Sequence, residues 1–344
     1  MTPSPIRWGI LGTGKIAHKF AADLKHTTGE AVAVGSRTVQ SAESFAREFN
    51  IPKAYSSYEA LLADPDVQVV YVSSPHSEHQ THTLQALRAG KAVLCEKPLA
   101  PTAPQVSEMI EEARQRKLFL MEALWMYFLP TFRQAQAWIE DGQIGEVRMI
   151  RAEFGFPAPT DPTNRLFNPA LAGGALLDIG IYPLTFALRL AGAPLAQVQS
   201  TMKRAATGVD AATALQLTFE NDVFASLACT FESRMRNEAV VYGTKGHIHL
   251  PLFWQSTEAY LYHDQSQAAH FQDDRSTWGY NFEAEAVHEC LRKGELESAQ
   301  MTWQHSTELI GLMDGIRHEH GFIYPFEQPN KSLFFSGLKT ILAL

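Results

Sequence analysis

Cysteine is scarce in this chain. Its 344 residues contain only Cys95, Cys229 and Cys290, which are scattered, odd in number and free of CxxC spacing. This pattern argues against a disulfide framework and against structural zinc, and it indicates a reducing compartment. The residues after Met1 run directly into a strand-like segment, without a charged region followed by an apolar core. We therefore expect a cytoplasmic protein.

An excess of positive charge is also missing. The formal net charge is −8, which argues against nucleic acid or an anionic membrane surface as the main partner. No apolar run approaches membrane-spanning length, so we expect no membrane partner. A phosphate-bearing ligand needs only local positive charge, and it remains compatible with this composition.

Linkers rich in proline, glycine or serine are absent too, although the length predicts two domains. Over residues 1–123, short β-branched strands alternate with amphipathic helices, a pattern typical of a doubly wound parallel sheet. Over residues 124–344, a helix near 130–141 is followed by alternating strands and short polar turns. This second pattern predicts an α+β domain with a large, mostly antiparallel sheet. We expect the two domains to share an interface and helix 282–293 to fold back against it.

A glycine-rich motif follows the first expected strand. Gly12-Thr13-Gly14-Lys15-Ile16-Ala17 has G-x-G-x-x-G/A spacing and opens a helix. In this context the first glycine makes a tight turn, and the second lets the backbone approach a pyrophosphate at the helix N-terminus. A purely structural glycine turn is the alternative. The motif predicts that Gly12, Thr13, Gly14, Lys15 and Ile16 bind a dinucleotide.

The end of the second expected strand distinguishes NADP from NAD. NAD sites usually place an acidic residue there, but this chain has Gly35-Ser36-Arg37-Thr38. Ser36 and Arg37 suit a 2′-phosphate through charge-assisted hydrogen bonds, so we expect NADP (NADP+ or NADPH). The alternative is that Arg37 is a solvated surface residue.

Two further loops follow buried strands at the edge where such sheets bind ligands. In Ser73–His79, the residues Ser74, His76 and His79 are candidates for contact with the cofactor. The spacing of the two histidines resembles a metal site, and His82 extends the series, but no third or fourth ligand in a matching arrangement is evident, so we expect no metal. Glu96-Lys97-Pro98 forms the second loop, in which Lys97 is a candidate to bind a substrate hydroxyl or stabilise a phenolate. In isolation, Lys97 is equally well explained as a surface lysine.

The most distinctive stretch is Gly173–Tyr182, which sets Asp178 and Tyr182 four residues apart behind two glycines. A phenol can serve as the acid or base in hydride transfer only if a neighbouring group lowers its pKa from about 10. Pro183 disfavours helical geometry just before it, which predicts a break near residues 180–181 and a new helix from about residue 183. Spacing alone allows an ordinary helix carboxylate and a core aromatic side chain instead.

Taken in order, these motifs resemble the glucose-fructose oxidoreductase/inositol dehydrogenase-type (Gfo/Idh/MocA) family over nearly the whole chain. The resemblance is carried by four segments: Gly12–Ala17, Pro75–His79, Glu96–Pro98 and Gly173–Tyr182. Many members have histidine at the position of Tyr182. With tyrosine at this position, the chain resembles the branch that contains dimeric dihydrodiol dehydrogenases and NADP-dependent D-xylose dehydrogenases.

This resemblance implies a role for each candidate. Arg37 would bind the 2′-phosphate, Lys97 and Tyr182 would transfer the proton, and Asp178, His76 and His79 would orient substrate and cofactor. Glu96 lies in the cofactor-side motif with Lys97. Aromatic pocket positions of the branch match three further residues: Trp125, Phe154 and Trp254. The family also implies a homodimer formed through the C-terminal sheet.

The function hypothesis is reversible hydride transfer between NADP(H) and a carbinol or carbonyl carbon of a sugar or cyclic trans-diol. Two alternatives stay open. One is a glycoside hydrolase of the same family that uses tightly held NAD transiently. The other is a non-catalytic NADPH-binding sensor, against which Lys97, Asp178 and Tyr182 count.

Overall fold

The structure, a computed structural model, describes residues 4–327. Contacts divide this part of the chain into two compact units, residues 4–128 with 275–310 and residues 129–274 with 311–327. The outer ends of the two expected domains, residues 1–3 and 328–344, lie outside the described residues. The expected boundary after residue 123 stays a prediction about where the chain divides into independently folding domains.

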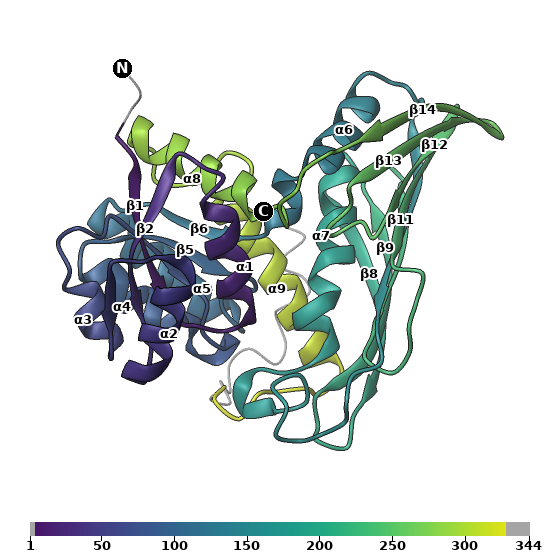
Figure 1. Ribbon diagram of the computed structural model, residues 1–344. Coiled ribbons are helices and arrows are strands. Elements are labelled where there is room, and N and C mark those ends of the chain that lie inside the picture. The colour runs from purple at the N-terminus through teal and green to yellow at the C-terminus, as the bar shows by residue number, and fades with distance from the viewer. Residues whose placement is uncertain (1–3, 328–344) are drawn as a thin grey trace. The chain divides into compact units, whose positions relative to one another are not determined.

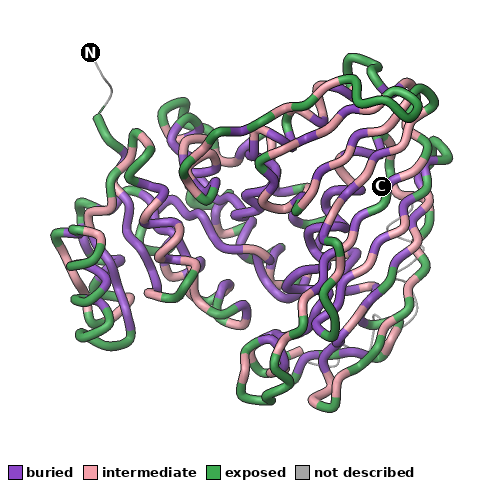
Figure 2. The backbone as a smooth tube through the Cα atoms, turned by 45° about the vertical axis from the view of Figure 1, so that its right-hand side comes forward, coloured by how far each residue is buried: buried purple, intermediate pink, exposed green. Residues whose placement is uncertain are grey.

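A six-stranded parallel sheet forms the centre of the first unit, in the order β3-β2-β1-β4-β5-β6 (Figure 1). This order confirms the expected doubly wound sheet. Its strands are β1 (Ile6–Leu11), β2 (Gly29–Gly35), β3 (Lys53–Tyr55), β4 (Val69–Val72), β5 (Ala92–Glu96) and β6 (Leu120–Ala123). The central strands β4 and β5 are buried along their whole length (Figure 2), as apolar strands covered on both faces should be.

Helices cover this sheet in two layers, α8-α1-α2 and α3-α4-α5. The helices of the unit are α1 (Lys15–Leu24), α2 (Val39–Phe49), α3 (Tyr58–Leu62), α4 (His79–Arg88), α5 (Ala103–Arg116), α8 (Tyr280–Lys293) and the first part of α9 (Trp303–Glu319). Short 3-10 turns cover His76–Glu78 and Trp125–Phe128. Ser57 caps α3, because its side chain accepts a hydrogen bond from the Ala60 N–H.

Helix α8 comes late in the chain but belongs to the first unit. The Asp23 carboxylate in α1 accepts hydrogen bonds from the backbone N–H groups of Trp278, Gly279 and Tyr280, at 2.8 to 3.1 Å. These donors are the unsatisfied groups at the start of α8, so Asp23 fixes that end of the helix. Farther along, the buried Trp8 indole donates to His288 Nε2 at 2.8 Å.

The second unit is built on an eight-stranded sheet in the order β14-β13-β12-β11-β7-β10-β9-β8. All neighbouring strands are antiparallel except β7 and β10, which confirms the expected mostly antiparallel sheet. The strands are β7 (Val147–Gly155), β8 (Leu195–Arg204), β9 (Asp210–Phe219), β10 (Phe224–Thr230), β11 (Glu238–Gly243), β12 (Gly246–Pro251), β13 (Glu258–His263) and β14 (Ser266–Gln272).

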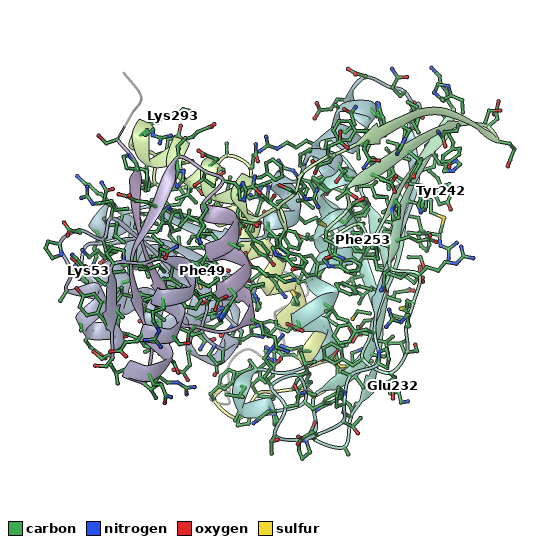
Figure 3. The ribbon with its side chains drawn as sticks, viewed as in Figure 1. Phe49, Lys53, Glu232, Tyr242, Phe253 and Lys293 are labelled. Atoms are coloured by element: carbon green, nitrogen blue, oxygen red, sulfur yellow. The ribbon has the colours of Figure 1, made fainter. Side chains whose placement is uncertain are left out.

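Helices α6 (Pro130–Glu140) and α7 (Ile181–Leu190) pack on one face of this sheet (Figure 1). Along β9 and β10, buried side chains on that face alternate with more exposed side chains on the opposite face. Phe253, labelled in Figure 3, is buried and packs edge-on against Phe186 of α7, with ring centroids 5.4 Å apart. The core of this unit therefore lies between the sheet and its helices.

One helical stretch, Pro169–Leu190, has the length and composition of a membrane span, which the sequence reading overlooked. Of its most apolar window, 89% is buried inside the protein. Most of this stretch is the packed core helix α7 with the turns before it, and its apolar character follows from that packing.

Candidate active site

The glycine motif forms the turn between β1 and α1. Gly12 has a φ of +105°, a conformation that favours glycine, and its N–H donates to the Gly35 carbonyl at 3.0 Å. Gly14 is the residue before α1, and no side chain caps the free N–H groups there. A Cβ added at Gly14 would meet no atom within 4 Å. The backbone donors and this open space fit a dinucleotide pyrophosphate at the helix N-terminus.

Ser36 and Arg37 follow β2 immediately. The Thr13 and Ser36 hydroxyl oxygens lie 3.3 Å apart, so the structure brings the glycine turn and the end of β2 together. Arg37 is exposed, and among residues 4–327 no carboxylate forms an ion pair with it. A guanidinium beside a buried hydroxyl suits a phosphate group better than a ribose hydroxyl.

His79 joins the loops that follow β4 and β5. It is fully buried, and its Nδ1 and Nε2 lie 2.7 Å from the Pro98 carbonyl and 2.9 Å from the Ser74 carbonyl. Burial lowers the pKa of His79 to about 4, so the ring is neutral at pH 7 and donates to one of these carbonyls. His76 packs against it, with ring centroids 5.6 Å apart. Any effect of His79 on a cofactor would therefore act through the two loops that it joins.

The backbone around Lys97 is held from several directions. The Lys97–Pro98 peptide bond is cis, and the Lys97 N–H donates to Glu96 Oε2 at 3.3 Å. The Tyr71 hydroxyl also donates to Glu96. On the other side of the turn, the Leu99 N–H donates to Glu122 Oε1 at 2.9 Å. The structure thus fixes the residues that flank Lys97, all within the first unit.

Gly173 and Gly174 are not helical, but from Ala175 onward the stretch is helical and continuous with α7, so the expected break near residues 180–181 and new helix at residue 183 are wrong. A π-helical turn over Leu176–Gly180 runs directly into α7, which begins at Ile181. Pro183 lacks an N–H, and its ring would crowd the carbonyl four residues earlier in a regular α-helix. The wider π turn just before it accommodates the proline without ending the helix.

Two buried groups hold the start of this stretch. Asp210 Oδ2 accepts from the Leu176 N–H at 2.7 Å, and the Tyr324 hydroxyl donates to the Gly173 carbonyl at 2.7 Å. Gly174 has a φ of +127° and faces Asp210, which explains the need for glycine there. Burial raises the pKa of Asp210 to about 6, although the Leu176 and Thr213 hydrogen bonds lower it.

Asp178 and Tyr182 are both nearly buried in the second unit. Arg165 Nη1 lies 3.1 Å from Asp178 Oδ1 in an ion pair, and the Arg165 side chain is 53% exposed. The sequence reading missed Arg165, because it lies in an irregular segment where no spacing rule applies. It also missed Glu122 and Asp210. The one signal for Glu122 that the sequence contains, a lone carboxylate in the apolar strand Leu118–Ala123, was not used.

The aromatic candidates divide between the units. Phe154 and Trp254 stack with centroids 3.7 Å apart, and Phe154 lies 5.9 Å from the Tyr182 ring. The second unit therefore brings two of the predicted substrate residues to the predicted catalytic phenol. Trp125 belongs to the first unit, where it stacks on Tyr280 at 4.7 Å.

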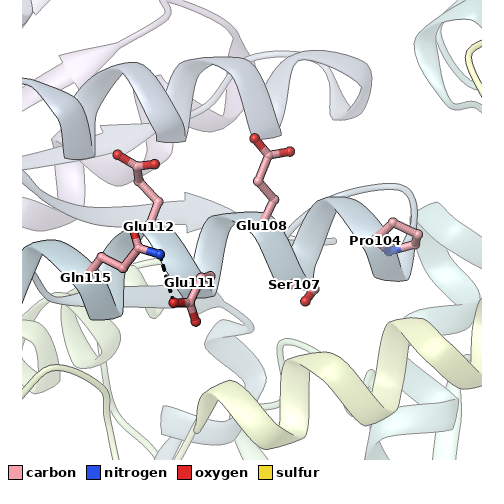
Figure 4. A pocket seen from close by; sticks show the side chains of 6 residues that line it. All are labelled: Pro104, Ser107, Glu108, Glu111, Glu112 and Gln115. Carbon is pink, nitrogen blue, oxygen red and sulfur yellow. Dashed lines mark hydrogen bonds between the residues drawn. The ribbon is translucent and has the colours of Figure 1, made fainter.

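One groove on the first unit is lined by none of these residues. It has a volume of about 490 Å³ and follows one face of α5 (Figure 4). Three of its lining residues are glutamates, and no predicted site residue lines it. Its negative charge opposes binding of a phosphate-bearing cofactor. Within residues 4–327, no group of three or more His, Cys, Asp or Glu side chains is arranged to hold a metal ion.

Known proteins resemble the chain over most of its length. Trans-1,2-dihydrobenzene-1,2-diol dehydrogenases of Mus musculus and Homo sapiens are 38% and 37% identical to it. Each alignment covers 93% of this chain and 98% of the relative. Among solved structures, an aldose-aldose oxidoreductase from Caulobacter crescentus with glycerol has a TM-score of 0.85 at 25% identity, covering 92% of this chain and 98% of that one.

A 3-ketoreductase from Actinomadura kijaniata, solved with NADP and TDP-benzene, has a TM-score of 0.82 at 28% identity, with 91% of this chain and 97% of that chain covered. Residues 6–124 match the family described as an oxidoreductase family with an NAD-binding Rossmann fold, and residues 132–249 match the GFO/IDH/MocA C-terminal domain. The two matches together span more than half of the chain and agree with the two sheets. The chain therefore belongs to the GFO/IDH/MocA family and is a nicotinamide-dependent oxidoreductase.

Proposed function

We propose that this enzyme uses NADP(H) and acts on the carbinol or carbonyl carbon of a sugar or a cyclic trans-diol. The preference for NADP is supported by Ser36 and Arg37 at the end of β2, and by the NADP in the related ketoreductase. The substrate class is supported by the similarity to a trans-1,2-dihydrobenzene-1,2-diol dehydrogenase and to an aldose-aldose oxidoreductase. Sugars and cyclic diols both present a hydroxyl-bearing ring to the enzyme.

The observation that carries the proposal is the Tyr182 phenol beside the stacked rings of Phe154 and Trp254. An aromatic surface packs against the apolar face of a sugar or diol ring, and the nearby phenol supplies one polar group that fixes its orientation. Tyr182 lies on helix α7, whose preceding turn is anchored by Asp210. A fixed backbone of this kind is what a positioned acid or base requires.

The proposed mechanism assigns one task to each side chain. When bound, the nicotinamide supplies or accepts the hydride. Tyr182 takes the proton of the substrate hydroxyl during oxidation and returns it during reduction. The Lys97 ammonium favours the phenolate form of Tyr182 by its positive charge. Asp178, held by Arg165, orients the substrate hydroxyl.

The cofactor roles divide along the first unit. Gly12, Thr13, Gly14, Lys15 and Ile16 would hold the pyrophosphate by backbone N–H groups. The loops with Ser74, His76, His79, Glu96 and Lys97 would border the nicotinamide. Trp125 would complete the substrate surface.

We also propose a homodimer through the outer face of the large sheet. That face has half-buried aromatic and histidine side chains in rows, with Tyr242 (Figure 3) beside His247 and Tyr262. His247 and Tyr262 stack at 4.6 Å. Rows of this kind present apolar surface, which a second copy of the chain would remove from water. Measurement of the solution mass should give twice the 38.3 kDa of one chain, whereas a mass of 38.3 kDa would contradict the dimer.

The cytoplasm remains the proposed location. Cys95, Cys229 and Cys290 are buried free thiols, which suits a reducing compartment.

The function is tested by screening NADP+ reduction and NADPH oxidation with sugars, dicarbonyls and trans-diols, and repeating each assay with NAD(H). We expect turnover with at least one ring substrate and a preference for NADP(H). NADPH binding without turnover of any substrate would instead indicate a sensor. Glycoside cleavage without net reduction of added NADP+ would indicate a hydrolase.

A further inference from the structure

We infer that Glu122 is a positioning residue for the Lys97 turn, and that its carboxylate is the counter-charge that makes this turn respond to pH. The inference rests on the proposed role of Lys97 in proton transfer. It concerns residues of the first unit only.

Geometry places Glu122 directly behind the turn. Glu122 lies in β6, paired with Cys95 of β5, and is 3% exposed. Its Oε1 accepts from the Leu99 N–H at 2.9 Å, and its Oε2 accepts from the Ser306 hydroxyl of α9 at 2.6 Å. One carboxylate therefore ties the turn to the helix on its other side, two residues from Lys97.

Burial brings the pKa of the Glu122 carboxyl close to neutral pH. Burial raises the pKa of Glu122 to about 7, against the lowering effects of the Ser306 and Leu99 hydrogen bonds and of the Lys97 charge. The neighbouring strand and turn present Cys95, Glu96 and Lys97 to Glu122, and α9 presents Ser306. Burial raises the pKa of Cys95, which stays a neutral thiol, and Glu96 disfavours a second negative charge.

The two protonation states hold the turn differently. As a carboxylate, Glu122 accepts both hydrogen bonds and offsets the Lys97 charge. Once protonated, one oxygen becomes a donor, which weakens the acceptor set and removes the negative charge. We therefore expect kcat to rise with pH through about 7.

The experiment compares wild type with Glu122→Gln and Ser306→Ala in kcat and KM from pH 5 to 9. Glu122→Gln keeps the size and one acceptor but cannot ionise, so the rise near pH 7 should disappear and kcat at pH 8 should fall about tenfold. Ser306→Ala removes a hydrogen bond that favours the carboxylate, so the same rise should move to higher pH. KM for the substrate should change little in both variants.

A second readout does not depend on turnover. Infrared difference spectra of the cofactor-free protein should show one carboxyl titrating near pH 7 in wild type, at higher pH in Ser306→Ala, and absent in Glu122→Gln. Persistence of the kcat rise in a folded Glu122→Gln protein, or an unmoved carboxyl signal in Ser306→Ala, would overturn the inference. Normal turnover in Lys97→Met would instead overturn the proposed role of Lys97, while leaving the infrared result readable.

Discussion

The Lys97 turn and the Gly173–Tyr182 stretch use the same device in different units. Each is irregular backbone held by a buried carboxyl on a neighbouring strand, Glu122 for the Leu99 N–H and Asp210 for the Leu176 N–H. Burial raises the pKa of both carboxyls, to about 7 and about 6. A backbone that departs from regular structure needs such acceptors, because its N–H groups have no ladder partner.

The difference lies in what each carboxyl faces. Glu122 has both oxygens hydrogen-bonded and senses the Lys97 charge. Asp210 uses one oxygen for both of its bonds, and its Oδ1 has no hydrogen-bond partner among the described residues. The first arrangement links the turn to the Lys97 charge that we propose acts in catalysis, and the second fixes a helix start. Given the proposed role of Lys97 in proton transfer, we expect catalysis to respond to pH through the Lys97 turn rather than through the Asp210 carboxyl.

The largest expected effects come from the two proposed catalytic side chains. Lys97→Met and Tyr182→Phe should each lower kcat by about 10²- to 10⁴-fold, because each removes a group needed for proton transfer. NADPH affinity, measured by fluorescence titration, should stay within a few-fold of wild type in Tyr182→Phe. Near-normal turnover in either variant would show that the substituted residue is not needed for proton transfer.

Replacing Asp210 should change the pH dependence of the free energy of unfolding, whereas replacing an exposed carboxylate should not. The pKa of Asp210 is raised in the folded state from 3.8 to about 6, so its contribution is full below about pH 4 and is lost as pH rises to about 6. In wild type, this loss lowers the free energy of unfolding by on the order of 3 kcal/mol. The Asp210→Asn variant should not show it, because its side chain does not ionise. Urea denaturation from pH 4 to 7 measures it, with the exposed Asp141→Asn as control. Parallel curves for Asp210→Asn and wild type would be the contrary result.

Cofactor recognition should depend on the first unit alone. Arg37→Ala should raise KM for NADP(H) by about 10- to 100-fold and leave KM for NAD(H) nearly unchanged, because it removes a charge-assisted bond to the 2′-phosphate. The matched control is Arg47→Ala, at an exposed arginine on α2 that pairs with Glu43. An equal loss for both cofactors would argue against a phosphate contact at Arg37.

The smallest expected effect concerns the aromatic pair in the second unit. Trp254→Ala should raise KM for a ring substrate by about 3- to 10-fold with little change in KM for NADP(H). Trp278→Ala, at a tryptophan 52% exposed, is the control and should change neither constant. If both tryptophans behave alike in steady-state kinetics, the Phe154–Trp254 pair is core packing only.

Local patterns were sufficient to predict both sheets and the glycine turn. Long-range contacts were not predictable, because Asp23 meets residues 278–280 only after folding. The strands β3, β13 and β14 were not predicted. The sequence of the edge strand β14, Ser266–Gln272, is mostly polar and exposed, so it has no apolar pattern to identify it. Glu122 and Asp210 stayed hidden for a related reason: a carboxyl's role depends on which backbone N–H the fold brings to it.

Whether Lys97 and Tyr182 act as one catalytic unit is the central claim, and a double-mutant cycle tests it most directly. The kcat of Lys97→Met/Tyr182→Phe should lie within a few-fold of the slower single variant, because removing either partner already disables proton transfer. A double variant slowed by the product of the two single effects would show that the two residues act independently and would contradict this account.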